Sequence, residues 1–139
     1  MSKSGFPIDH LGIAVRSIED RLTFYSEILG MPVTHRETVE HEQVHVAMLA
    51  AGESRLELLQ PTSAESTIGK FLDKRGEGLH HIALRVPNLA ATVEKLKAAG
   101  SRILNEPRIG AGGHLYVFVH PASTGGVLLE LIQDQEHSF

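Results

Sequence analysis

Two histidines occupy matching places in two similar stretches of the chain. Residues 8–15 (IDHLGIAV) and 79–86 (LHHIALRV) both predict a strand, and the third residue of each is a histidine, His10 or His81. The two histidines are 71 positions apart. Imidazole binds divalent metal ions, and it also exchanges protons near neutral pH. The repeated histidine therefore indicates metal binding or acid–base chemistry.

Two glutamates repeat in the same way. Glu57 and Glu130 each stand between two leucines in the tripeptide Leu-Glu-Leu, 73 positions apart. Neighbouring side chains of a strand point to opposite faces, so the leucines are expected under a covering helix and the glutamates on the other face. The same alternation places His10 and His81 opposite their bulky apolar neighbours. All four polar residues are thus expected on one side of the sheet.

The simpler interpretation of a single buried histidine is a hydrogen-bonded core residue. A glutamate in an apolar strand, however, is costly unless it is paired. Two such glutamates and two such histidines at matched positions favour a metal site made of His10, Glu57, His81 and Glu130. Imidazole and carboxylate together suit a first-row divalent ion, and four ligands leave two octahedral positions for water or substrate.

Each half of the chain also contains a predicted helix after its first strand. Ser17 and Asn88 are suited to cap these helices, and Gly30 and Gly100 to end them. Apolar residues at helical spacing form the expected buried stripes: Ile18, Leu22, Tyr25 and Leu29 in the first half, and Leu89, Val93 and Leu96 in the second.

Three further strands are expected in each half. They cover residues 32–38, 43–50 and 55–60 in the first half and 102–105, 115–120 and 127–133 in the second. The predicted fold class is α+β, with two tandem βαβββ modules that form a cupped mixed β-sheet with helices on the outside.

The modules are expected to form one domain over residues 1–139. Module one covers about 8–60 and module two about 79–133, and residues 61–78 join them through a short helix around Ile68, Phe71 and Leu72. Gly76 and Gly78 predict a turn into the next strand.

Composition excludes several classes of protein. With 42% hydrophobic and 22% charged residues, the chain is neither disordered, collagen-like nor a coiled coil. Net charge is −4 and the basic residues are scattered, which argues against a nucleic-acid partner. No apolar run is long enough to span a bilayer, and the start lacks an apolar signal region, so a cytoplasmic protein is expected. The absence of cysteine excludes disulfides, thiolate nucleophiles and zinc–thiolate sites.

Several stretches resemble the vicinal oxygen chelate superfamily, which includes glyoxalase I and extradiol dioxygenases. The likeness is greatest to the methylmalonyl-CoA epimerase family and runs from Ile8 to about Gln133. The stretches that carry it are IDHLGIAV (8–15), LELLQP (56–61), GLHHIAL (78–84), PRIGAGG (107–113) and VHPASTGGVLLE (119–130). The last of these is the most specific.

The resemblance implies a divalent ion, Co²⁺ first and Mn²⁺, Ni²⁺ or Zn²⁺ as alternatives, held by His10, His81 and Glu130, with Glu57 at the fourth position. It also implies a homodimer that epimerises methylmalonyl-CoA at C2, a step of propionate metabolism. The reaction removes a proton beside a thioester carbonyl and returns one to the opposite face, which favours two bases. Glu130 is the preferred base and Glu57 the second.

One departure from the family bears on the bases. Some members carry a glutamate on the third strand, where this chain has Val46, and a glutamine at the position of Glu57. The carboxylate is thus found on the neighbouring strand, and the identity of one base stays open.

Two other functions stay open at this stage. Glyoxalase I also uses two histidines and two glutamates for enediolate chemistry, whereas a dioxygenase needs two histidines and one carboxylate, which Glu57 would crowd. A metal-free binding protein of the same fold need not keep four ligands on one face.

Charge alone makes Lys70, Arg75 and Arg108 candidates for CoA contacts. The glycine-rich loop 110–113 before His114 is interpreted either as a lid over a ligand or as a plain mobile hairpin.

Overall fold

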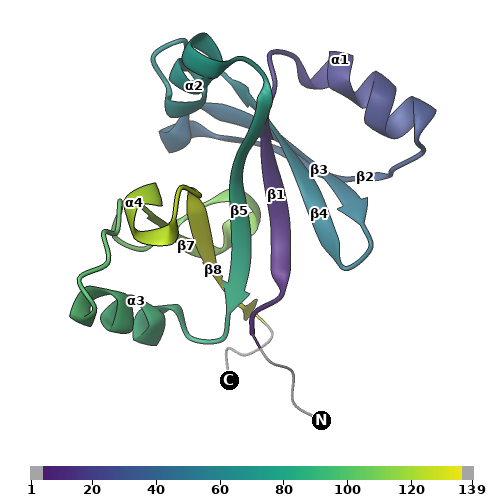
Figure 1. The fold of residues 1–139 in the computed structure, drawn as a ribbon. Helices are drawn as coiled ribbons and strands as arrows, with labels where there is room; N and C mark the ends of the chain where they lie inside the picture. The colour runs from purple at the N-terminus through teal and green to yellow at the C-terminus, as the bar shows by residue number, and fades with distance from the viewer. Residues whose placement is uncertain (1–4, 136–139) are drawn as a thin grey trace. The chain divides into compact units, whose positions relative to one another are not determined.

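The structure is a computed structural model, and it describes residues 5–135. The chain divides into two compact units, which we call the N-unit (residues 10–80) and the C-unit (residues 81–139 with 1–9). Figure 1 shows the course of the chain through the elements of both units. None of the helices formed by residues 5–135 combines the length and the apolar character needed to cross a membrane.

The N-unit contains a mixed sheet in the order β2-β3-β4-β1. Its elements are β1 (Ile8–Ala14), α1 (Ile18–Leu22), η1 (Thr23–Ile28), β2 (Val33–Val39), η2 (Glu40–Glu42), β3 (Val44–Ala51), β4 (Ser54–Pro61) and α2 (Thr67–Arg75). Strands β2, β3 and β4 pair antiparallel, and β1 joins β4 in parallel. The first two residues of β1 belong to the C-unit.

The C-unit repeats this pattern in the order β5-β8-β7-β6. Its elements are β5 (Gly78–Val86), α3 (Leu89–Ala98), β6 (Arg108–Ile109), η3 (Ala111–Gly113), β7 (Leu115–Val119), α4 (Pro121–Thr124) and β8 (Leu129–Gln133). Strand β8 is parallel to β5 and antiparallel to β7. The α+β class with tandem βαβββ modules is therefore confirmed.

The core residues lie on the strand faces that the alternation of apolar residues predicts. In the N-unit, α1 packs on β3 and β4 through a cluster of Val15, Ile18, Ala47, Leu49 and Leu58. In the C-unit, α3 packs through Val86, Leu89, Val93, Val117, Val119 and Leu131. The predicted glutamates and histidines belong to the opposite parity on these strands, so each sheet has an apolar helix-facing side and a second side that carries the polar pair.

Two glutamines join the glutamate-bearing strands to the helices in the same way in both units. At the end of β4, the Gln60 side-chain carbonyl accepts the Ile18 backbone N–H at 2.8 Å. At the end of β8, Gln133 accepts the Leu89 N–H at 2.9 Å. Each bond satisfies one of the donors that a helix start leaves unpaired. The predicted caps Ser17 and Asn88 satisfy further donors, so both helix starts are confirmed.

The predicted stripe of the first helix is wrong at its last position. Leu29 is 57% exposed, whereas Tyr25 and Met31 contact the core. The chain changes from α-helix to π-helix at Thr23, and the Leu29 N–H bonds five residues back, to Phe24 O at 3.0 Å. The wider turn rotates Leu29 away from the apolar face.

The strand expected at residues 102–105 is also wrong. Only Ile103 forms an isolated bridge, to Val119, and β6 lies further along the chain. Backbone bonds to the neighbouring chain are made by Arg102 and Leu104. At Asn105 the side chain replaces the backbone, because it accepts the Phe118 N–H at 2.8 Å and donates to Tyr116 O at 3.3 Å. Pro107, which has no backbone N–H, follows closely.

The joining segment (residues 61–78) is bonded to residues in and just before α1 through the Glu77 carboxylate. Glu77 accepts the Arg16 backbone N–H at 2.8 Å and the Arg21 guanidinium Nε–H at 2.7 Å. Burial raises the pKa of Glu77, but the Arg16 bond and the Arg21 cation outweigh that effect, so its pKa lies below the usual value. The predicted helix of this segment is α2, which begins at the cap Ser66.

Candidate metal centre

The N-unit brings together one of the predicted histidines and one of the predicted glutamates. His10 lies on β1 and Glu57 on the adjacent strand β4, and their Nε2 and Oε1 atoms are 3.1 Å apart. Both residues are buried, with 3% and 5% of their surface exposed. Gly12 is the neighbour of Glu57 across the parallel pair, so the residue next to the glutamate has no side chain.

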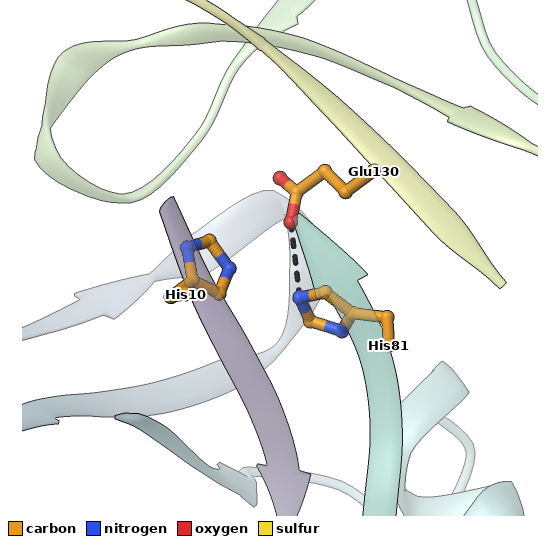
Figure 2. A group of neighbouring side chains, drawn as sticks. All are labelled: His10, His81 and Glu130. Atoms are coloured by element: carbon orange, nitrogen blue, oxygen red, sulfur yellow. Dashed lines mark ion pairs between the residues drawn. The ribbon is translucent and has the colours of Figure 1, made fainter. Parts of the chain in front are cut away.

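The C-unit repeats the arrangement with the other pair. His81 lies on β5 and Glu130 on β8, with Nε2 and Oε1 3.0 Å apart, the contact drawn as a dashed line in Figure 2. Both residues are buried. Ala83 is the neighbour of Glu130 across the strand pair, so a small residue again adjoins the glutamate. Each unit therefore carries the same buried imidazole–carboxylate pair on the same two strands.

The chemistry of each pair suits a cation. A carboxylate that is buried away from water needs a charged or hydrogen-bonding partner, and each pair meets this need through imidazole Nε2. The same nitrogen and oxygen atoms are those through which histidine and glutamate bind divalent ions. The pairs thus supply imidazole and carboxylate donors already directed at each other.

An aromatic row that sequence reasoning missed adjoins the C-unit pair. The Phe118 ring stands edge-to-face with the His81 imidazole, with centroids 5.3 Å apart and an interplanar angle of 88°. Tyr116 follows at 5.6 Å from Phe118. The alternation of residues 115–119 (LYVFV) placed both rings on the face of Glu130, and this signal was available from the sequence.

Val46, at the departure from the family pattern, is buried on β3. Its cross-strand neighbours are Leu59 on β4 and Glu37 on β2. Glu37, a carboxylate that was not predicted as a site residue, lies 2.5 Å from the His35 imidazole nitrogen. Cross-strand neighbours share a face, so Glu37 belongs to the same side of the N-unit sheet as Val46.

The structure places the proposed CoA contacts on the surface. Lys70 and Arg75 are exposed on α2, and the Arg75 guanidinium lies over the Phe71 ring at 5.9 Å. Arg108 is exposed on β6. Their contact with CoA stays a prediction.

The glycine-rich loop before β7 is a short 3₁₀ turn. Gly110 has no room for a side chain, since a Cβ atom there would lie 2.9 Å from two Tyr116 ring atoms. His114 is half-buried after the turn, and its Nδ1 atom has no hydrogen-bond partner.

Comparison with known protein families matches most of the chain. The model of the Glyoxalase/Bleomycin resistance protein/Dioxygenase superfamily matches residues 9–118. The chain therefore belongs to this superfamily.

Comparison with individual proteins shows to which family of this superfamily the chain belongs. The mitochondrial methylmalonyl-CoA epimerase of Homo sapiens is 39% identical over 91% of this chain and 73% of its own. The uncharacterised protein YqjC of Bacillus subtilis is 42% identical over 91% of both chains. A variant of the Streptomyces coelicolor methylmalonyl-CoA epimerase, solved in complex with 2-nitronate-propionyl-CoA, superposes with a TM-score of 0.90 at 39% identity over 95% of this chain and 99% of its own. Within the superfamily, the chain belongs to the methylmalonyl-CoA epimerase family.

Proposed function

We propose that this protein is a metal-dependent methylmalonyl-CoA epimerase, which interconverts the (2R) and (2S) forms of its substrate by moving the proton at C2. The observation that carries the proposal is the pair of buried imidazole–carboxylate contacts, 3.1 Å and 3.0 Å long, at matched positions of the two repeats. The names of the relatives support the substrate class, an acyl-CoA whose C2 lies between the thioester carbonyl and a carboxylate.

The ligands proposed for one divalent ion are His10, Glu57, His81 and Glu130. Three of them, His10, His81 and Glu130, are buried side chains with ligand atoms of the kind that hold a metal ion (Figure 2). Co²⁺ is the first ion to test, and Mn²⁺, Ni²⁺ and Zn²⁺ also suit imidazole and carboxylate ligands. When bound, the ion supplies positive charge that stabilises the negative charge developing on the thioester oxygen.

The chain's own carboxylates move the proton. Glu130 takes the C2 proton from one face of the substrate, and Glu57 returns a proton to the other face. Two bases are needed because a single immobile base would mostly return the proton to the face from which it came. Each carboxylate has two oxygens, so one can bind the ion while the second exchanges the proton.

The buried surroundings of the two glutamates serve the same reaction. Both carboxylates are buried, and the cross-strand neighbour of each is apolar, Met48 for Glu57 and Phe118 for Glu130. Few water molecules reach a buried carboxylate during a turnover, so each base exchanges its proton with the substrate then and with solvent between turnovers.

Proton exchange at C2 is the direct test. Purified protein is loaded with Co²⁺ and incubated with (2S)-methylmalonyl-CoA in D₂O, and deuterium at C2 and formation of the (2R) form are followed by NMR and chiral chromatography. We expect exchange and inversion with Co²⁺ and neither with EDTA. If the protein consumed methylglyoxal in the presence of glutathione and caused no proton exchange on methylmalonyl-CoA, the activity would instead be that of glyoxalase I.

The variant Glu130→Gln tests the first base. We expect kcat to fall by roughly 10²–10⁴-fold, the usual contribution of a general base. Near-normal turnover in this variant at saturating Co²⁺ would remove Glu130 from the reaction.

Further proposals concern the assembly and its setting. We propose a homodimer that acts in propionate metabolism in the cytoplasm. Light scattering after gel filtration measures the oligomeric state, and cell fractionation measures the location.

A further inference from the structure

Phe118 adjoins both members of the His81–Glu130 pair. It faces the His81 imidazole edge-to-face, at 5.3 Å and 88°. It is also the cross-strand neighbour of Glu130, since β7 and β8 pair in the register Phe118–Glu130. Cross-strand neighbours share a face, so one ring adjoins the imidazole and the carboxylate together.

The ring is itself held in place. The backbone of Phe118 is bonded on the edge of β7 that faces the 102–105 segment: its N–H donates to the Asn105 side chain at 2.8 Å, and its carbonyl accepts the Leu104 N–H at 2.8 Å. On its own face, Tyr116 packs against it at 5.6 Å and 76°. Tyr116 is buried at 4% exposure, so this support is fixed.

A fixed edge-to-face ring restricts the rotation of its partner. Such aromatic contacts contribute roughly 0.5–1.5 kcal/mol beyond the area they bury, and they depend on the angle between the rings. A histidine that binds a metal ion needs its ring plane fixed by a neighbour, so that its nitrogen points to the ion. His81 is fixed on one side by Glu130, through Nε2, and on another by the Phe118 ring.

We propose that Phe118 is a positioning residue of the metal centre, which sets the plane of the His81 imidazole and thereby the direction of Nε2. The inference rests on the proposed function in that it takes His81 as a metal ligand. The placement of the imidazole by Phe118 is a property of the metal-free protein as well.

The experiment compares three variants of the full chain. Phe118→Leu removes the ring, and Phe118→Tyr keeps it. Phe24→Leu is the matched control, because Phe24 makes an edge-to-face contact of similar geometry with Tyr25, at 5.1 Å and 81°, on the helical segment of the N-unit. The measurements are the Kd for Co²⁺, the visible spectrum of bound Co²⁺ and the Tm of the metal-free protein.

We expect Phe118→Leu to raise the Kd for Co²⁺ about tenfold, the lower end of the effect of removing a group that orients a metal ligand. Its Co²⁺ spectrum should also change, because the spectrum depends on the direction of the bound nitrogen. Phe118→Tyr and Phe24→Leu should keep the wild-type Kd and spectrum. A lower Tm for Phe118→Leu with unchanged Kd and spectrum would overturn the proposal, since it would leave Phe118 only a packing role.

A metal-free measurement separates this proposal from the proposed function. In ¹⁵N NMR of the metal-free chain, the His81 imidazole nitrogens should show a second orientation or tautomer in Phe118→Leu and one state in wild type and Phe24→Leu. If wild type binds no Co²⁺, the proposed metal chemistry fails, and the NMR result alone decides the role of Phe118. An unchanged His81 spectrum in Phe118→Leu would overturn the positioning role whatever the outcome with Co²⁺.

Discussion

The loss of one ligand should remove most of the stabilisation that a metal ion gives this protein. Glu130→Gln is the informative change, because glutamine keeps the shape of a side chain that is buried beside His81 at 3.0 Å and can still accept a hydrogen bond from Nε2. The free energy of unfolding of the metal-free protein should therefore change little. What the substitution removes is the negative charge that the ion needs.

The magnitude follows from binding linkage. With free Co²⁺ at 100 times the Kd, binding stabilises the native state by about 2.7 kcal/mol. For a chain of this size, 1 kcal/mol shifts the Tm by about 4 °C, so wild type should gain roughly 10 °C. Loss of a ligand should raise the Kd by at least the roughly 100-fold that loss of an orienting group can cause. At the same Co²⁺ concentration the stabilisation then falls to about 0.4 kcal/mol, or a shift of about 2 °C.

The assay is thermal unfolding, followed by circular dichroism, with Co²⁺ and with EDTA. Glu106→Gln is the matched control, since the Glu106 side chain is 84% exposed and lies 3.9 Å from Lys97. This control variant should show the same Co²⁺-induced rise in Tm as wild type. An equally large shift in Glu130→Gln would refute the reasoning, because it would show that the ion binds without this carboxylate.

Three predictions concern the elements that hold the pairs in place. Glu77→Gln should lower the free energy of unfolding at pH 7 by about 1 kcal/mol; because folding lowers the pKa of Glu77, this difference should hold above the usual value near 4.5 and vanish as the pH falls through the folded value, which urea unfolding from pH 7 to 3 measures. Gln133→Ala should cost more than Gln60→Ala, about 2 against 1 kcal/mol, because the Gln133 amide also donates to Pro87 O at 2.7 Å; equal costs in urea unfolding would contradict the assigned bonds. Leu89→Ala, at a residue only 2% exposed, should cost about 2–5 kcal/mol and leave the Co²⁺ Kd of the folded protein unchanged, as measured by calorimetry.

The pairs themselves could be predicted from the sequence because strand alternation is strict. Once residues 8–14 and 54–61 form neighbouring strands whose bulky apolar residues face the helix, His10 and Glu57 must share the opposite face. The same reasoning holds for His81 and Glu130. The face that a strand residue occupies depends on its odd or even position along the strand, so the two repeated stretches were enough to predict the pairs.

Other features were not predictable in this way. The exposure of Leu29 follows from a π-helical turn, which a helix pattern of period 3.6 does not reveal. The missing strand at 102–105 follows from Asn105, whose side chain bonds to the backbone of β7. Such local competition between side chain and backbone depends on the neighbouring strand, and the sequence does not display it.

We propose that the two repeats provide their histidines and glutamates to a single ion, and a cobalt-soaked crystal examined by anomalous diffraction tests this proposal most directly. We expect one cobalt per chain, bound by His10, Glu57, His81 and Glu130. A cobalt bound elsewhere, or two ions each held by one pair, would contradict it.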